Sequence, residues 1–115
     1  MNSEECPITY AIHLLAKKWT LQIIFFLHNS EKPLRFLELK RQVGAVTQKE
    51  LTKRLRELEI HGLVSRKIYA EVPPRVEYSL TARTRDVYPH LTGILNWAEK
   101  NGEKFMKKAQ KDQAR

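Results

Sequence analysis

The 115-residue sequence contains one cysteine and no long apolar run. A single cysteine excludes a disulfide within the chain and is typical of a reducing compartment. The longest apolar stretch, residues 23–27, is far shorter than the roughly 20 residues that cross a bilayer. The start of the chain, with Glu4 and Glu5, lacks the basic and apolar segments of a secretory signal. These absences predict a cytoplasmic protein without a membrane anchor.

Motifs for catalysis and for metal binding are also absent. His13, His28, His61 and His90 have no metal-ligand spacing to one another or to Cys6. The sequence has neither a glycine-rich phosphate loop nor a convincing nucleophile–base arrangement. We therefore expect no enzymatic activity, no bound metal and no cofactor.

Positive charge is concentrated in two segments of a chain whose length suits one domain, residues 1–115. The net charge is +8; residues 35–67 hold nine Lys and Arg against four Glu, and residues 99–115 hold six against three acidic residues. Such a surplus favours a polyanionic partner such as nucleic acid, although a solvated basic surface gives the same composition. The spatial order of the charges has to distinguish the two.

Apolar spacing predicts helices on both sides of residue 30. One helix covers residues 7–28, starts at Pro7 and carries Ile8 and Ile12 on its apolar face. A short helix begins near Arg35 and stops at Gly44. Its tight connection to the next helix makes the two a helix-turn-helix candidate.

The helix expected over residues 48–61 has two chemically different faces. Its start is specified by a capping box of Thr47 and Glu50, and Gly62 is the residue type that commonly follows a helix end. Apolar residues recur at i, i+4 and i+7 on one face: Leu51, Leu55 and Leu58. Cations recur at the same spacing on the opposite face: Lys49, Lys53 and Arg56. Side chains that can hydrogen-bond to bases lie near the amino-terminal end: Thr47, Gln48 and Thr52. This layout is typical of a helix that reads the major groove of double-stranded DNA.

A β-hairpin is expected directly after this helix, over residues 64–80. Val64 and Ile68 share one face of its first strand, and Pro73 and Pro74 stiffen its tip. Arg75 lies where it can reach a minor groove or a phosphate. Three more cations are expected on the DNA backbone: Arg35, Arg66 and Lys67. A hairpin in this place is interpreted as a wing; the alternative is a plain hairpin that covers the core.

The last helix is expected over residues 82–110, with Pro89 near its start and Gly102 weakening its later half. It has an apolar face formed by Leu91, Ile94, Leu95 and Ala98. One small core has little room for this face and for that of the first helix, so we expect both helices to form a homodimer interface. Packing within the domain is the alternative.

Several blocks at fixed spacing resemble one known family over nearly the whole chain. They are "CP" at 6–7, "KW" at 18–19, "RFLEL" at 35–39, "LTKRLRELE" at 51–59, "GLVSR" at 62–66 and "PPRVEYSLT" at 73–81. This pattern resembles the HxlR family of winged helix-turn-helix transcription regulators, distant relatives of the MarR group. The resemblance implies a mainly α fold with a small β-hairpin. It also implies a recognition helix over 48–61, a wing over 64–80, and helices over 7–28 and 82–110 that form a homodimer on an inverted-repeat operator.

Two positions of the pattern, Cys6 and Thr84, carry expectations of their own. Cys6 is expected at the N-cap of the first helix, where the helix dipole stabilises a thiolate and where Glu4 and Glu5 oppose that effect. The resemblance implies a thiol sensor here, because some members of the family use the cysteine of "CP" to sense quinones, aldehydes or oxidants; an inert structural thiol is the alternative. Thr84 stands where the family pattern usually has a glycine, a departure that affects only the start of the last helix.

The function favoured is that of a sequence-specific transcriptional regulator, with repression favoured over activation. Its inducer, a small molecule or an electrophile, is not identified by the residues. The alternative is a winged-helix module for protein–protein contact without specific DNA binding, but such a helix would present apolar or aromatic anchors where Lys49, Lys53 and Arg56 stand. A non-specific nucleic-acid coat is disfavoured by the polar residues Gln48 and Thr52.

Overall fold

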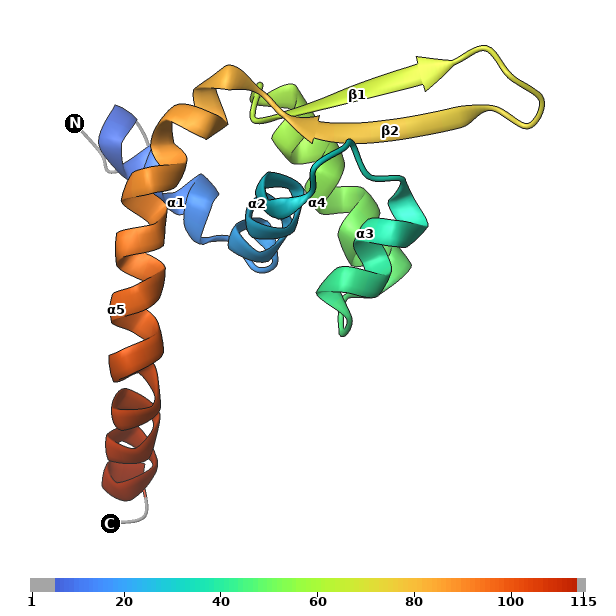
Figure 1. Ribbon diagram of the computed structural model, residues 1–115. Coiled ribbons are helices and arrows are strands. Elements are labelled where there is room, and N and C mark those ends of the chain that lie inside the picture. The colour runs from blue at the N-terminus through green and yellow to red at the C-terminus, as the bar shows by residue number, and fades with distance from the viewer. Residues whose placement is uncertain (1–5, 114–115) are drawn as a thin grey trace. The chain divides into compact units, whose positions relative to one another are not determined.

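The computed structural model describes residues 6–113, which form five α-helices and one β-hairpin (Figure 1). In chain order the elements are α1 (Pro7–Ala16), α2 (Thr20–Asn29), α3 (Phe36–Val43), α4 (Gln48–Ile60), β1 (Val64–Tyr69), β2 (Arg75–Leu80) and α5 (Ala82–Gln113). The mainly α winged-helix fold with a small hairpin is confirmed. None of the helices in residues 6–113 combines the length and the apolar character needed to cross a membrane.

The chain, predicted as a single domain over residues 1–115, consists of two compact units. One unit extends to Thr84 and the other begins at Arg85, so the boundary lies within the first turn of α5. The first unit contains α1 to α4 and both strands. All the elements expected to contact DNA therefore belong to one compact unit.

The helix expected over residues 7–28 is two helices. α1 ends at Ala16 and α2 begins at Thr20, and between them Trp19 has a left-handed backbone conformation with φ of 76°. This conformation costs a residue other than glycine roughly 1–2 kcal/mol. The break contains neither glycine nor proline, and the apolar residues keep their helical spacing across it. The sequence therefore predicts a continuous helix.

The core of the first unit is built on the apolar face of α4. Leu51, Leu55 and Leu58 are buried as predicted, together with Ile23 of α2 and Leu39 of α3. The leucine spacing brings all three side chains to one face of the helix, so their burial orients α4 about its own axis.

Both ends of α4 are specified by local contacts. The Thr47 hydroxyl accepts the Glu50 N–H at 3.1 Å, and the Thr47 N–H donates to Glu50 Oε1 at 3.0 Å. These two bonds are the capping box that the sequence predicted. At the other end Gly62 has φ of 72°, a conformation in which a side chain would be strained. The recognition helix predicted over residues 48–61 thus runs from Gln48 to Ile60.

The hairpin is anchored at its base and exposed toward its tip. β1 and β2 pair antiparallel from Val64 opposite Leu80 to Tyr69 opposite Arg75. A bridge ties the base to the α2–α3 connection, because Leu34 and Tyr78 exchange backbone hydrogen bonds of 3.0 and 2.8 Å. Val64 is buried, but Ile68 is 60% exposed. Val64 and Ile68, predicted to share one face of the strand, therefore differ in burial between the base and the tip of the hairpin.

Thr84 closes the connection between the hairpin and α5. Its side chain is fully buried, and its hydroxyl donates to the Leu63 carbonyl at 2.7 Å. The departure from glycine at this position does not disturb the helix, which begins at Ala82. A threonine here adds a hydrogen bond that glycine could not make.

Leu55→Ala should lower the free energy of unfolding by about 2–5 kcal/mol, because it opens a cavity in the core. Ile60→Ala on the same helix, where the side chain is 81% exposed, should change it by less than about 0.5 kcal/mol. Urea denaturation followed by circular dichroism measures both. Equal losses for the two variants would contradict the buried face assigned to α4.

Candidate nucleic-acid interface

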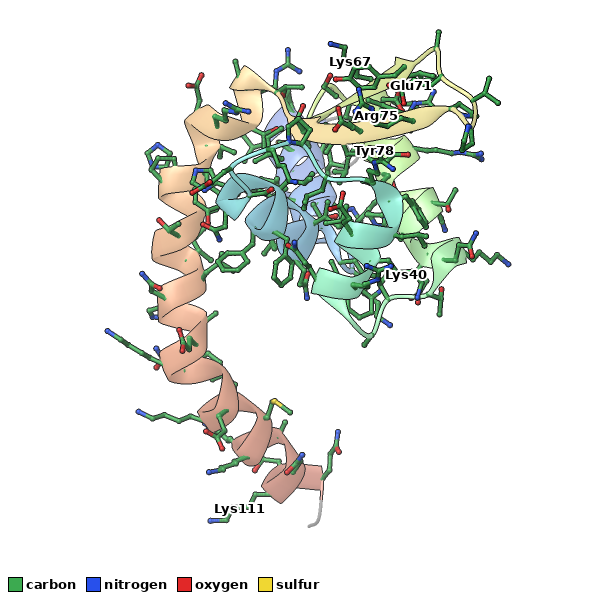
Figure 2. The ribbon with its side chains drawn as sticks, turned by 45° about the vertical axis from the view of Figure 1, so that its right-hand side comes forward. Lys40, Lys67, Glu71, Arg75, Tyr78 and Lys111 are labelled. Carbon is green, nitrogen blue, oxygen red and sulfur yellow. The ribbon has the colours of Figure 1, made fainter. Side chains whose placement is uncertain are left out.

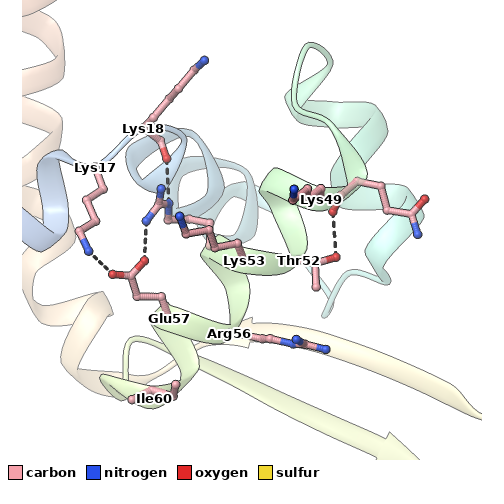
Figure 3. A pocket seen from close by; sticks show the side chains of 10 residues that line it. Lys17, Lys18, Lys49, Thr52, Lys53, Arg56, Glu57 and Ile60 are labelled. Carbon is pink, nitrogen blue, oxygen red and sulfur yellow. Dashed lines mark hydrogen bonds and ion pairs between the residues drawn. The ribbon is translucent and has the colours of Figure 1, made fainter.

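The outer face of α4 lines a shallow groove of about 1010 Å³ (Figure 3). Because the leucines face inward, the three cations predicted to contact DNA are directed outward and are exposed: Lys49, Lys53 and Arg56. Gln48 and Thr52 line the same groove. The structure thus brings together five of the six residues predicted to read the major groove.

The hydroxyl groups of Thr47 and Thr52 both form hydrogen bonds with the backbone of α4. Thr47 caps α4, as described above, and does not line the groove. Thr52 donates its hydroxyl hydrogen to the Gln48 carbonyl at 2.8 Å. Its oxygen keeps acceptor capacity and its methyl group remains available for apolar contact, so Thr52 can still face a base, whereas Thr47 is a helix cap.

Three basic residues of the groove were missed by reasoning from the sequence: Lys17, Lys18 and Arg54. Lys17 and Lys18 belong to the α1–α2 connection and line the groove beside α4 (Figure 3). The Lys18 ammonium group lies 3.7 Å from Glu50 Oε2, and 72% of its side chain is exposed. A basic pair is visible in the sequence, but the expectation of a continuous helix gave no reason to place it next to α4.

The Glu50 carboxylate connects the start of α4 to the α1–α2 connection. Trp19 Nε1 donates to Glu50 Oε2 at 2.9 Å, while Oε1 accepts the Thr47 N–H. These bonds stabilise the charged form: the Trp19 indole contributes most, then the backbone N–H and hydroxyl of Thr47, and Lys18 adds a smaller effect. Together they lower the pKa of Glu50 to about 2. Glu50 is therefore ionised throughout the physiological pH range.

Glu57 forms a second ionic contact with the same connection. It is paired with Lys17 and accepts a hydrogen bond from Arg54 Nη1 at 2.5 Å. The hydrogen bond from Lys17 is the largest cause of the lowered pKa of Glu57, and the charges of Lys17 and Arg54 act in the same direction. Glu50 and Glu57, on one flank of the cationic face of α4, are thus compensated by basic groups.

The cations predicted on the wing are mostly engaged within the protein. Arg75 Nη2 lies 3.3 Å from Glu71 Oε1 (Figure 2). The guanidinium carbon of Arg75 lies 3.8 Å from the centroid of the Tyr69 ring. Lys67 Nζ lies 4.8 Å from the same centroid, and Arg66 Nε lies 3.3 Å from Glu59 Oε1. Arg75, predicted to reach a minor groove or a phosphate, thus has its guanidinium group in contact with Glu71 and Tyr69 of the hairpin.

Arg35 and Arg75 line a second groove of about 740 Å³, between the start of α3 and β2. This groove also contains Lys32 and Arg41, together with the carboxylates of Glu38 and Glu77. None of the cations of the α4 groove lines it. Of the predicted DNA-binding cations, three line the α4 groove, Arg35 and Arg75 line the second groove, and Arg66 and Lys67 line neither. Only the α4 groove combines such cations with Gln48 and Thr52.

Cys6 occupies the N-cap position of α1 and is half-buried. The pKa of its thiol is lowered, chiefly by the Thr9 backbone N–H, then by the Thr9 hydroxyl and the Ile8 N–H. Glu4 and Glu5, which were expected to oppose this effect, lie outside the described residues. These contacts raise the ionised fraction of the Cys6 thiol above that of an unperturbed cysteine.

The residues expected at a dimer interface differ in exposure. On α1, Ile8 and Ile12 are 75% and 60% exposed. On α5, Ile94 and Ala98 are exposed, Leu95 is half-buried and Leu91 is buried. Leu91 has little surface to offer a second chain.

Within residues 6–113, no three His, Cys, Asp or Glu side chains gather closely enough to hold a metal ion.

The chain is similar to transcription regulators over most of its length. A family model described as HxlR-like helix-turn-helix matches residues 14–106. A relative from Halalkalibacterium halodurans, named as an HTH-type transcriptional regulator, is 45% identical over 100 residues, covering 87% of this chain and 88% of the relative. A crystal structure of a MarR-family protein from Porphyromonas gingivalis has a TM-score of 0.74 at 40% identity, covering 88% of this chain and 97% of that one. The redox regulator HypR in its oxidized form has a TM-score of 0.73 at 36% identity, covering 84% and 97%.

The lowered pKa of Glu50 predicts a pH-dependent contribution to stability. Because the folded pKa of about 2 is below the value of about 4.3 for an unfolded chain, ionised Glu50 stabilises the fold above about pH 4.3, and this contribution is lost as the pH falls toward 2. Urea denaturation should find wild type more stable than Glu50→Gln at pH 7. The difference should shrink steadily between about pH 5 and pH 2. A difference that is the same at pH 7 and pH 3 would contradict this role of the carboxylate.

Proposed function

The chain belongs to the HxlR-like helix-turn-helix family, and on this basis we propose that it binds inverted-repeat operators as a homodimer in the cytoplasm. The members of the family are transcriptional regulators and not enzymes. Binding would read a specific sequence through α4 and would repress by occupying promoter DNA. Double-stranded DNA and a second copy of the chain are the proposed partners.

The proposal rests on the composition of the outer face of α4. Lys49, Lys53 and Arg56 are exposed along one side of the helix, with Gln48 and Thr52 in the same groove. Cations can neutralise phosphates, and amide and hydroxyl groups can hydrogen-bond to base edges. A protein-binding helix would carry apolar anchors here, and Ile60 is the one large aliphatic side chain that lines this groove among the described residues.

Two further features support the proposed mode of binding. Lys67 is exposed on β1, a position from which a wing can contact a phosphate or the minor groove. The exposed apolar residues Ile8 and Ile12 on α1 and Ile94 on α5 favour burial against a second chain. A dimer places two copies of α4 on one duplex, with half-sites roughly 10 bp apart.

Replacing Lys49, Lys53 and Arg56 by alanine, singly and together, should weaken binding to both a preferred duplex and a random one. The preferred duplex is first selected from a random library with the wild-type protein. Each phosphate contact that is lost should flatten the dependence of log affinity on log salt by about 0.9. Fluorescence anisotropy at several salt concentrations measures the slope.

Thr52→Ala and Gln48→Ala are the matched variants, because they remove hydrogen-bonding groups and no charge. They should leave the salt slope unchanged and lower the preference for the selected duplex by about tenfold. Full binding by the triple alanine variant would show that α4 does not contact DNA. Binding by wild type without any preference would overturn sequence-specific reading and leave only a nucleic-acid coat.

We also propose that Cys6 makes DNA binding sensitive to oxidants. The lowered pKa of its thiol and the structural similarity to a redox regulator support this. Diamide accepts two electrons and two protons from a pair of thiols, which become one disulfide. With one cysteine per chain, the second thiol would come from a partner chain or from a small thiol. The adduct would alter the packing of α1.

Diamide should lower the affinity of wild type for the selected duplex by about 5–150-fold, the usual range of coupling between two sites. Cys6→Ser should be unaffected, and a reducing agent should restore wild-type binding. Unchanged wild-type affinity would identify Cys6 as a structural thiol. An equal loss in Cys6→Ser would assign the effect to another residue.

A further inference from the structure

Three consecutive residues of the α1–α2 connection contact α4. Lys17 is paired with Glu57, the Lys18 carbonyl accepts a hydrogen bond from Arg54 Nε at 2.9 Å, and Trp19 Nε1 donates to Glu50 Oε2 at 2.9 Å. Figure 3 shows the first two contacts. We call the connection of residues 17–19 the bracket.

The partners of the bracket form a third stripe on α4. Glu50, Arg54 and Glu57 recur at i, i+4 and i+7, so they share one side of the helix between the leucines and the exposed cations. The bracket therefore holds α4 along two turns. Contacts at a single end would leave the helix free to tilt, whereas contacts spread along its length restrict both its tilt and its rotation.

Trp19, the last residue of the bracket, has a strained backbone conformation. Its φ of 76° lies in a region that side chains other than glycine rarely occupy. Two features hold it there: the indole is bonded to Glu50, and the next residue, Thr20, is completely buried. Such strain persists where the surrounding structure over-determines it, and it is often found at functional sites.

The bracket lies directly beside the face proposed to read DNA. The groove along α4 is lined by Lys17 and Lys18 of the bracket and also by Lys49, Lys53 and Arg56. A binding surface must be held to about 0.5 Å and 10–20° of its productive geometry by the residues around it. A small rotation of α4 would misalign the directional hydrogen bonds of Gln48 and Thr52, whereas the cations, on long flexible side chains, would still reach phosphates.

We propose that Trp19 and Glu50 are positioning residues for DNA recognition. Their hydrogen bond sets the orientation in which α4 presents its reading residues, without either side chain having to contact a base. This inference rests on the proposed function, because it concerns how well α4 discriminates between sequences. It assigns a role in specificity to two residues outside the cationic face.

The test measures affinity for the selected duplex and for a random duplex in Trp19→Phe, Glu50→Gln and the double variant. Trp19→Phe keeps a ring and removes the indole N–H, so affinity for the selected duplex should fall about tenfold. Affinity for random DNA should change by less than about twofold, and the salt slope should stay the same, because no cation is removed. Glu50→Gln keeps an oxygen acceptor and should lose less of the preference. The double variant should lose no more than Trp19→Phe, because both changes remove the same interaction.

Glu38→Gln is the matched control for the helix cap. Glu38 accepts the Arg35 N–H at 2.9 Å at the start of α3, which is the contact that Glu50 makes with Thr47 at the start of α4. Glu38→Gln therefore weakens a cap and removes one charge, and it should leave the ratio of the two affinities unchanged. Circular dichroism confirms that each variant is folded at the temperature of the binding assay. If Trp19→Phe is unfolded at that temperature, the ratio of the two affinities in Glu50→Gln alone tests the positioning role.

The outcomes separate this inference from the proposed function. Loss of preference in the bracket variants with retention in Glu38→Gln supports the positioning role. An unchanged ratio in folded bracket variants, even if their unfolding temperature is lower, overturns it and leaves Trp19 and Glu50 with a role in stability alone. If wild type binds neither duplex, the proposed function fails and the positioning role fails with it.

Discussion

The burial of Leu51, Leu55 and Leu58 determines which way the rest of α4 faces. When one face of a helix is buried, the residues on the opposite face point to solvent. Lys49, Lys53 and Arg56 are therefore exposed as a direct consequence. Burial of the leucines, which stabilises the first unit, therefore also leaves these three cations exposed to solvent. The capping box of Thr47 and Glu50 fixes where this arrangement begins along the chain.

A surface that attracts phosphate must compensate any carboxylate beside it. Glu50 and Glu57 lie next to the cationic face, and each is held by the bracket. Lys17, Lys18 and Arg54 neutralise them, and the hydrogen bonds from Trp19 and Lys17 are the largest causes of their lowered pKa values. The same contacts therefore hold α4 rigidly and leave its groove with a net positive potential, which is what the proposed DNA-binding role requires.

The elements with local signals could be predicted from the sequence. A capping box, Gly62 and a leucine period defined α4, and alternation after two prolines defined the hairpin. The break at Trp19 could not be predicted, because the left-handed backbone conformation of this residue is accompanied by a hydrogen bond to Glu50, which lies 31 positions away in the sequence. For the same reason Lys17 and Lys18 were not assigned to the groove. The contacts of Arg75 with Glu71 and Tyr69 depend on the geometry of the hairpin, which charge and period alone do not specify.

The most direct test of the account is to find which surface meets DNA. Amide chemical shifts of the ¹⁵N-labelled protein, followed during titration with the selected duplex, locate that surface without any mutation. The account predicts the largest changes at Gln48, Lys49, Thr52, Lys53 and Arg56, with smaller ones at Lys17, Lys18 and Lys67. Changes confined to the groove between α3 and β2, with the amides of α4 unaffected, would contradict it.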